Sequence, residues 1–358
     1  MRFLTALNMP IFISSFSLLA IGILVIYSSS PELALQQAIF GAFGIGFYIF
    51  LSSFDYKTVK GLTLYPYLLV LVLLLIVALL GFETRGSVRW IPLGLFNIQP
   101  SEFAKPALIL FLAYFWSVHI PNWRNIFKSL LWVSPIALLI FRQPDLGSFL
   151  TVMAIWGGML LASGISLKKI ILLILVAVLV IPVGWFTLQE YQKQRIHSFL
   201  SPQSDPLGVG YNIIQSTIAV GSGEFIGRGL GRGTQSRLQF LPEFRTDFIF
   251  ASIAEEMGFV GSMLIILIYL FLIVYCLKIA GNSANTFGFM IVFGVVSMLL
   301  FQTIVNIGMN VGILPITGIT LPLISYGGSS LVATLICLGL VSSIDRFKKR
   351  IDADFPRD

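Results

Sequence analysis

Three carboxylates mark the apolar segment that begins near residue 248. Asp247 lies at the start of this segment, and Glu255 and Glu256 lie eight and nine residues further along it. Ionisable groups inside an apolar span are costly, and those that occur there commonly have a function. A carboxylate can instead stabilise a helix start by compensating the helix dipole. The residues alone leave both interpretations open for Asp247. For the two glutamates they favour a structural role, in which the carboxylates are bonded within a helix bundle or line a polar cavity.

A second pair of charges lies in PSEFAK, residues 100–105. Pro100 and Ser101 predict the start of a helix, with Ser101 as the N-cap. Glu102 and Lys105 are then three residues apart on one face of the first turn, where they can form an ion pair. The alternative is that the Lys105 ammonium group meets an anionic head group at the membrane boundary.

RQPDLGSF, residues 142–149, places three polar side chains between two apolar segments: Arg142, Gln143 and Asp145. Pro144 suits the first position of a helix and Asp145 would compensate the dipole of that helix, which is a sufficient structural explanation. Polar groups crowded at a membrane boundary are also typical of a functional site.

The longest stretch without an apolar run, residues 189–247, is rich in Gly, Gln, Ser and Arg. Its IGRGLGRG motif superficially matches a dinucleotide-binding pattern, but no strand precedes it, and we reject that interpretation. The glycines would instead let the backbone approach an anion, together with Arg228, Arg232 and Arg237. Residues 211–223 predict an amphipathic helix on the outer interface of the membrane.

A further polar cluster, SYGGSS at residues 325–330, lies at the start of the last apolar segment. Small residues there favour close helix packing, and ligand binding by Ser325 and Ser329 is the alternative. The long loop contains a single histidine, His197, without a cysteine nearby, so the sequence predicts no zinc site.

The composition explains why these polar clusters stand out. The chain has 358 residues, of which 57% are hydrophobic and 11% charged, with a mean hydropathy of +0.92. About twenty apolar residues cross a bilayer as a helix. The sequence therefore predicts an all-α polytopic membrane protein, a single domain over residues 1–358, with about ten spans at 11–30, 33–53, 64–82, 102–119, 126–142, 145–163, 168–188, 248–277, 286–311 and 322–344.

The distribution of Lys and Arg predicts the orientation. With ten spans both ends of the chain share one side, and 13 of the 23 basic residues fall there. Six of the ten others belong to the loop at 189–247, and long loops are translocated largely regardless of their charge. Both termini are therefore expected in the cytoplasm. The loop, between spans seven and eight, is expected outside.

The polar clusters then share the outer face. They contain no Ser-His-Asp arrangement, no Walker loop and no paired cysteines. They offer carboxylates, cations and an apolar wall, which suit a substrate with an anionic head and a lipid tail. Two other classes are considered: a transporter, either a flippase for lipid-linked sugars or an ion-coupled carrier, and a scaffold for a partner enzyme. The net charge of +7 requires no nucleic-acid partner, because the basic tail DRFKKR suits anionic membrane lipids or a stop-transfer signal.

Five blocks of the sequence resemble, in order, the signature motifs of the SEDS family, whose members include FtsW, RodA and SpoVE. They are NIQPSEFAK, RQPDLGSF, DPLGVGYNIIQSTIAVGSG, GTQSRLQFLPEFRTDFIFASIAEEMGFVG and LPITGITLPLISYGGSS. The resemblance covers nearly the whole chain and is strongest to RodA. It implies a ten-span peptidoglycan glycosyltransferase that polymerises lipid II outside the membrane during cell elongation, with a class B penicillin-binding protein as its partner.

The resemblance also implies roles for individual residues. The family's essential aspartate falls on Asp247, and the substrate-binding positions that we assign are Glu102, Lys105, Gln143, Asp145, Arg195, Ser325 and Ser329. Two residues depart from the family pattern: Arg245 stands where His is common, and Glu224 where Gly is usual. We expect Arg245 to lower the pKa of Asp247 through its charge. No protein metal site is assigned, and a divalent cation such as Mg or Mn as cofactor is left open.

The implied reaction joins a sugar hydroxyl to the anomeric carbon of a donor that carries a lipid pyrophosphate. Hydrolytic glycosidases use two carboxylates because a sugar alkoxide is a poor leaving group. Pyrophosphate leaves readily, so one base and cations that hold the departing charge suffice. Asp247 is the expected base, in a direct displacement with inversion at the anomeric carbon.

Overall fold

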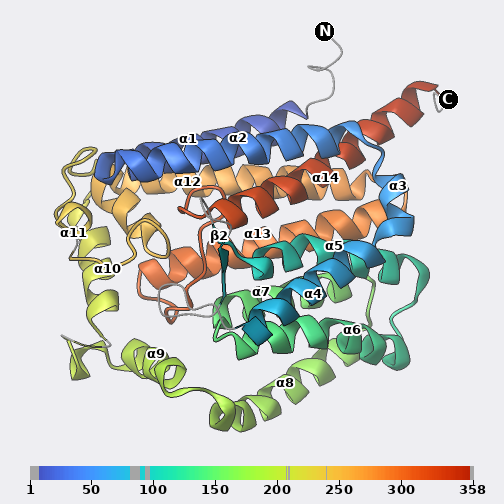
Figure 1. The fold of residues 1–358 in the computed structure, drawn as a ribbon, viewed down its shortest axis with the longest axis horizontal. Helices are drawn as coiled ribbons and strands as arrows, with labels where there is room; N and C mark the ends of the chain where they lie inside the picture. Colours follow the sequence, from blue (N-terminus) through green and yellow to red (C-terminus); the bar gives the residue numbers. More distant parts are fainter. Residues whose placement is uncertain are drawn as a thin grey trace.

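The computed structural model describes residues 8–80, 89–92, 97–206, 208, 210–238 and 240–354. The described chain is a bundle of long helices with almost no strand (Figure 1). Its long helices are α1 (Met9–Ser29), α2 (Pro31–Ser53), α4 (Leu64–Leu80), α5 (Pro100–Val118), α6 (Trp123–Arg142), α7 (Leu146–Ala162), α8 (Leu167–Thr187), α12 (Ile249–Gly281), α13 (Thr286–Asn310) and α14 (Gly328–Asp354). The short elements are α3 (Tyr56–Val59), η2 (Lys60–Leu62), β1 (Ile91–Pro92), β2 (Asn97–Ile98), α9 (Glu190–Leu200), η3 (Pro202–Ser204), α10 (Tyr211–Ser222) and α11 (Thr234–Arg237).

A long helix occupies each of the ten predicted apolar segments. Within the described residues, seven helices are long and apolar enough to cross a membrane, or eight if α4 and the short helices before it, bent by 58°, form one span. The helix α7 is apolar but shorter, with 17 residues. The protein is therefore a multi-pass membrane protein, and the number of ten spans stays a prediction.

Three helix starts named in the sequence analysis differ from the prediction. The helix α7 begins at Leu146 with Asp145 as its N-cap, so the prediction that Pro144 takes the first helical position is wrong: Pro144 precedes the cap with φ 25°. The helix α14 begins at Gly328 and not near 322, because the amide of Gln37 on α2 holds the preceding segment as a loop: its Nε2 donates to Ser325 O at 3.0 Å and its Oε1 accepts from Gly327 N at 3.2 Å. The helix α5 begins at Pro100 with Gln99 in the N-cap position, so the prediction that Ser101 is the N-cap is wrong.

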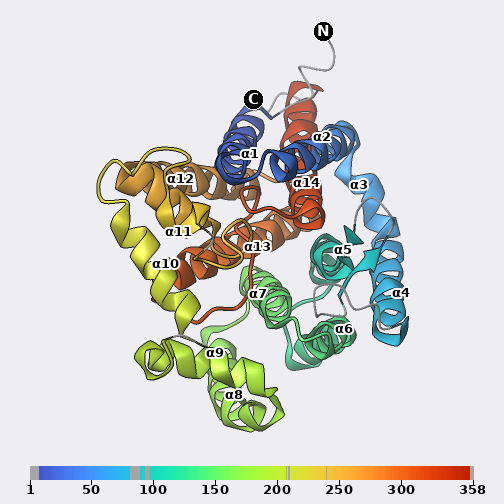
Figure 2. The same cartoon turned by 60° about the vertical axis from the view of Figure 1, so that its left-hand side comes forward.

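Both ends of the described chain lie at one end of the bundle. The Asn8 side chain, just before α1, donates to Asp345 Oδ2 on α14 at 2.8 Å. The helices α10 and α11 lie at the opposite end of the bundle (Figure 1). In Figure 2 the helix α8 lies at the margin of the bundle, next to α9, and its apolar window is not buried.

The Gly-rich turn after α10 fills a break in α12. At Gly258 the backbone leaves the helical conformation, with φ 64° and ψ −162°. Phe259 N donates to Glu224 O at 2.9 Å and Gly229 N donates to Glu256 O at 3.0 Å, so that the turn satisfies backbone groups on both sides of the break. The IGRGLGRG motif therefore serves as a partner for the α12 backbone.

The two glutamates inside α12 reinforce this contact. Glu255 Oε1 accepts hydrogen bonds from Gln235 N at 2.9 Å and from Thr234 Oγ1 at 3.1 Å. Glu256 accepts from the Ser28 hydroxyl, at the end of α1, at 2.9 Å. Both carboxylates are buried, which confirms the expectation of structural bonds within the bundle.

Candidate active site

Asp247 lies in the segment that leads into α12, and neighbouring elements hold the backbone of that segment. Three consecutive carbonyl groups accept hydrogen bonds there. Tyr326 N donates to Arg245 O at 2.8 Å and the Ser325 hydroxyl donates to Thr246 O at 2.6 Å. The side-chain amides of Asn306 and Asn310, on α13, donate to Asp247 O at 2.9 and 3.0 Å. The segment is thus fixed by α13 and by the loop before α14.

The environment of the Asp247 carboxyl group changes its acidity. Loss of hydration in its partly buried position is the largest influence, and it raises the pKa of Asp247 to about 6. Arg195 opposes this rise, Glu243 and Asp145 add to it, and Arg89 opposes it. A carboxylate with a pKa near neutrality is ionised at pH 7 and still basic enough to accept a proton, which suits a general base.

A glycine turn separates Asp247 from Arg195. A Cβ atom placed on Gly318 would lie 3.5 Å from Asp247 Oδ2 and 3.6 Å from Arg195 Nη1. Gly318 has φ +74°, a conformation that favours glycine, so the turn approaches both groups without a side chain. On α9, Tyr191 orients Arg195: its ring centroid lies 5.6 Å from Arg195 Cζ, and its hydroxyl donates to Pro144 O at 2.8 Å.

Asp145 is the second carboxylate of the site. It is buried and forms the N-cap of α7, where its Oδ1 accepts from Ser148 N at 3.0 Å. Its Oδ2 accepts from Gln99 Nε2 at 3.1 Å, and Arg89 Nη1 lies 4.0 Å from Oδ1. Arg89 also donates to the backbone carbonyls of Gln143 and Pro144. Asp145 is therefore held in place by both a cation and helix-capping bonds.

Glu102 and Lys105 form the predicted ion pair, but inside the bundle. Lys105 Nζ lies 2.7 Å from both carboxylate oxygens of Glu102, and the two residues are only 2% and 6% exposed. The ammonium group is thus bound by its neighbour and is not presented at the surface. The pair is not among the charges that act on Asp247. Ser101, one residue earlier, places its hydroxyl 3.4 Å from Asp145 Oδ2 and so joins α5 to the site.

The remaining predicted positions have structural partners. The Gln143 side chain donates to Leu74 O on α4 at 3.2 Å. Ser325 holds the carbonyl of Thr246, and the Ser329 hydroxyl accepts from Gln99 N at 3.1 Å. The structure therefore brings Asp145 and Arg195 to Asp247, and places the two serines in contact with the segments that carry the site.

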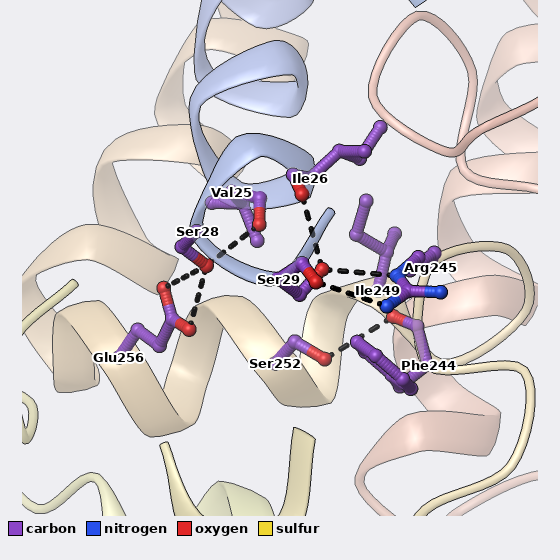
Figure 3. Close-up of a pocket in the computed structure, with 9 residues that line it drawn as sticks. All are labelled: Val25, Ile26, Ser28, Ser29, Phe244, Arg245, Ile249, Ser252 and Glu256. Carbon is purple, nitrogen blue, oxygen red and sulfur yellow. Dashed lines mark hydrogen bonds between the residues drawn. The ribbon is translucent and has the colours of Figure 1, made fainter. Parts of the chain in front are cut away.

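The prediction for Arg245 is wrong. Its side chain turns toward the end of α1, where Nε donates to Ser29 Oγ at 2.9 Å and Nη2 donates to Ser29 O at 3.1 Å (Figure 3). Its Cζ lies 4.5 Å from the centroid of the Phe244 ring. Because the guanidinium group points away, Arg245 is not among the charges that act on Asp247, and the pKa of Asp247 is raised and not lowered.

A recess lies beside Arg245 and is lined by residues of α1, of α12 and of the segment just before α12 (Figure 3). Glu256 and Ser28 meet at one side of it, and Arg245 and Ser29 at the other. Asp247 does not line this recess. The polar contacts in it therefore join α1 to α12 and are not part of the group around Asp247.

The described residues contain no group of three His, Cys, Asp or Glu side chains that could hold a metal ion. Asp145 is bonded to Gln99 and Ser148, and Arg89 and Arg195 lie near the two aspartates. Guanidinium groups in these positions already supply positive charge to the site. The donor set does not fit a metal ion held by protein side chains alone.

Sequence reasoning missed five residues of this arrangement: Arg89, Gln99, Tyr191, Asn306 and Asn310. Asn306 and Asn310 carry a signal that could have found them, because two amides spaced four residues apart on an apolar helix share one face. The other three lie in loops or in a short helix, and only the folded chain brings them to Asp145 and Asp247.

Comparison with known proteins gives a consistent result. The model of the cell cycle protein family that comprises FtsW, RodA and SpoVE matches residues 1–350. The chain is 39% identical over 341 residues to the peptidoglycan glycosyltransferase MrdB of Escherichia coli (strain K12), covering 94% of this chain and 92% of that protein. It is 36% identical to the stage V sporulation protein E of Bacillus subtilis (strain 168), covering 96% and 98%.

Solved structures agree. A chain from a study of structural coordination of polymerization and crosslinking by a peptidoglycan synthase complex matches with a TM-score of 0.84 and 29% identity, covering 95% of this chain and 98% of that chain. The rod shape determining protein RodA of Thermus thermophilus matches with a TM-score of 0.71 and 27% identity, covering 97% of each chain. The signature motifs, the helix bundle and these relatives confirm the family resemblance: the chain belongs to the FtsW, RodA and SpoVE family of cell cycle proteins.

Proposed function

We propose that this protein is a peptidoglycan glycosyltransferase that polymerises lipid II into β-1,4-linked glycan strands during cell elongation. The observation that carries the proposal is the partly buried Asp247 carboxyl group, with its pKa raised to about 6, beside the cation Arg195. The names of the relatives, peptidoglycan glycosyltransferase MrdB and rod shape determining protein RodA, support it.

Asp247 acts as the general base in this proposal. It accepts the proton of the acceptor sugar's 4-hydroxyl as the oxygen attacks the anomeric carbon of the donor. The bond from that carbon to the lipid pyrophosphate breaks on the opposite face, and the configuration inverts from α to β. A single base suffices because pyrophosphate is a good leaving group. The Gly318 turn leaves the Asp247 carboxylate approachable on the side of Arg195.

Arg195 is the cation placed to stabilise the departing pyrophosphate. Fixed positive groups aimed at developing negative charge are commonly the largest contribution to catalysis. Arg89 and Lys105 are each engaged by a carboxylate of the chain, Asp145 and Glu102 respectively. Arg89 and Lys105 therefore hold carboxylates of the chain in place and do not serve to neutralise the charge of the substrate. No step of this proposal passes through a metal ion.

The proposed setting is the inner membrane of a bacterial cell, with both termini in the cytoplasm and residues 189–247 outside. The excess of Lys and Arg on the side of the termini supports this orientation. Asp247 then faces the compartment in which glycan strands are built. The structural relative from a peptidoglycan synthase complex supports a partner that crosslinks the strands, which we take to be a class B penicillin-binding protein.

Purified protein, with and without its penicillin-binding partner, should convert lipid II into long glycan strands, and Asp247→Ala should produce none. Loss of a general base typically costs about 10²- to 10⁴-fold in rate. Glu190→Gln is the matched control, because Glu190 is an exposed carboxylate of the same loop that pairs with Lys193. Polymer from Asp247→Ala would contradict the assignment of the base. No polymer from wild type, with movement of lipid II across liposome membranes, would favour the flippase alternative.

A further inference from the structure

Asn306 and Asn310 lie one turn apart at the end of α13 that approaches Asp247. Both residues are completely buried. A buried amide is costly unless it is hydrogen-bonded. Each donates from Nδ2 to the carbonyl oxygen of Asp247, at 2.9 Å from Asn306 and 3.0 Å from Asn310. One backbone carbonyl therefore accepts from two side chains, which restrains its position more than a single bond would.

The Asn306 amide makes a second contact that concerns the carboxylate of Asp247. Its Nδ2 also donates to Ile319 O at 2.7 Å. Ile319 follows Gly318, the residue whose turn approaches Asp247 Oδ2. A single amide group thus joins the backbone of Asp247 to the turn that faces its carboxylate.

Asn310 fixes the same residue relative to α12. Its Oδ1 accepts from Ala251 N, in the first turn of α12, at 2.9 Å, and its Nδ2 also donates to Asn306 O at 2.8 Å. Both ends of the Asn310 amide are therefore engaged. Amide side chains do not titrate, so they hold Asp247 in the same way whether its carboxyl group is ionised or protonated.

We propose that Asn306 and Asn310 are positioning residues, which hold Asp247 so that its carboxylate meets the acceptor hydroxyl in the orientation needed for proton transfer. The inference rests on the proposed function for its catalytic consequence. Neither asparagine touches the reacting atoms, and both act through Asp247. Misplacement of a catalytic group by about 1 Å can cost about 10²-fold in rate.

The first test is Asn306→Ala in the full-length protein, with lipid II as substrate. We expect kcat to fall by about 10²-fold with KM changed by less than about twofold, because substrate contacts are retained while the base is displaced. Gln302→Ala is the matched control: Gln302 lies one turn earlier on α13, is also buried, and its side-chain Oε1 has no hydrogen-bond partner among the described residues. A purely structural role would lower the folded fraction of both variants but leave turnover per folded molecule unchanged in both.

Asn306→Asp gives a signature that packing alone does not produce. The substitution keeps the shape of the side chain, replaces a donor by an acceptor, and adds a negative charge beside Asp247. The new negative charge opposes ionisation of Asp247, as the charges of Glu243 and Asp145 already do. Arg195 and Arg89 act in the opposite direction and favour ionisation. The acid limb of the pH–rate profile should therefore move to higher pH in Asn306→Asp, and an unchanged limb together with wild-type kcat would overturn the proposal.

A second measurement is independent of polymerisation. A water-soluble carbodiimide with an amine nucleophile modifies protonated carboxyl groups, and mass spectrometry reads the modification of Asp247 as a function of pH. Release of the segment in Asn306→Ala should speed this labelling, while Gln302→Ala should label as wild type does. Wild-type labelling in Asn306→Ala would overturn the positioning role. If wild type makes no polymer, the proposed function fails, and the labelling still decides whether the asparagines hold Asp247.

Discussion

At the scale of single residues, charges of both signs around Asp247 determine the pH at which it can accept a proton. Reduced hydration of its carboxyl group is the dominant influence and raises the pKa to about 6. Arg195 is the first of the charges that moderate this rise. Without such a cation a larger fraction of the base would be protonated at neutral pH, and with stronger charge compensation it would be too weak a base.

The pH dependence of polymerisation follows from this balance. The rate should rise as pH increases through about 6, because Asp247 must be ionised to act as a base, and level off above it. Arg195→Gln removes a cation that lowers the pKa of Asp247, so the acid limb should move to higher pH, by up to about one unit. The measurement is the initial rate with lipid II between pH 5 and pH 9, with about 0.5-unit steps.

Lys193→Gln is the control for this prediction. Lys193 lies on the same helix, α9, pairs with Glu190, and is not among the charges that act on Asp247. Its pH–rate profile should match that of wild type. An Arg195→Gln profile with an unmoved or lowered acid limb would show that another group controls the rate.

At the scale of elements, the break in α12 connects the loop at residues 189–247 to the bundle. Gly258 adopts a positive φ, and a Cβ atom there would lie 2.3 Å from Gly227 N in the Gly-rich turn. Glu255 and Glu256, both just before this break, accept hydrogen bonds from the loop and from α1 respectively. The deeper carboxylates of this segment thus hold the loop in place, while Asp247 is the one available for chemistry.

Gly258→Ala should destabilise the protein markedly. A non-glycine residue at positive φ costs about 1–3 kcal/mol, and the clash with the Gly227 backbone adds to this cost. The apparent melting temperature in detergent should fall, and polymerisation should fall with it. Gly46→Ala is the control: Gly46 lies within α2 with nothing near its Cβ position, so alanine there should be neutral or stabilising by up to about 1 kcal/mol. Equal melting temperatures for the two variants would contradict the role of the break.

The elements also show which parts of the fold were predictable. Apolar runs of about twenty residues are a local signal, so all ten predicted segments proved helical. The start of α14 was misplaced because Gln37, far away on α2, holds residues 325–327 as a loop. The partner of Arg245 was likewise a distant residue, Ser29. Local composition gives the helices, whereas long-range hydrogen bonds decide their ends and the direction of individual side chains.

The candidate site was predictable to a similar degree. Motif resemblance identified Asp247 and Asp145, and the structure brings both into the same group of charges. It did not reveal that Lys105 is buried against Glu102, because an i,i+3 pair is compatible with either the surface or the interior. Burial depends on the neighbours that cover a helix face, and a single sequence does not specify them.

At the scale of the whole molecule, the site forms where many helix ends meet. The starts of α5, α7 and α12, the end of α13 and the loop before α14 all contribute groups to it. Residues 8 and 345 meet at the other end of the bundle, close to both ends of the described chain. The site and these two ends therefore lie at opposite ends of helices long enough to cross a membrane, and on opposite sides of it if the chain spans the bilayer as proposed.

This arrangement predicts the sidedness of labelling in intact cells. The native cysteines, Cys276 and Cys337, are buried and should not react with a membrane-impermeant maleimide. Ser204→Cys, in the exposed η3 turn of the outer loop, should be labelled from outside, and Ala284→Cys, in the exposed turn between α12 and α13, should be labelled only after the membrane is permeabilised. Labelling of Ala284→Cys in intact cells, with protection of Ser204→Cys, would reverse the orientation. That result would place Asp247 in the cytoplasm, so a strand polymerase would release its product on the wrong side of the membrane. Both the proposed topology and the proposed function would then be contradicted.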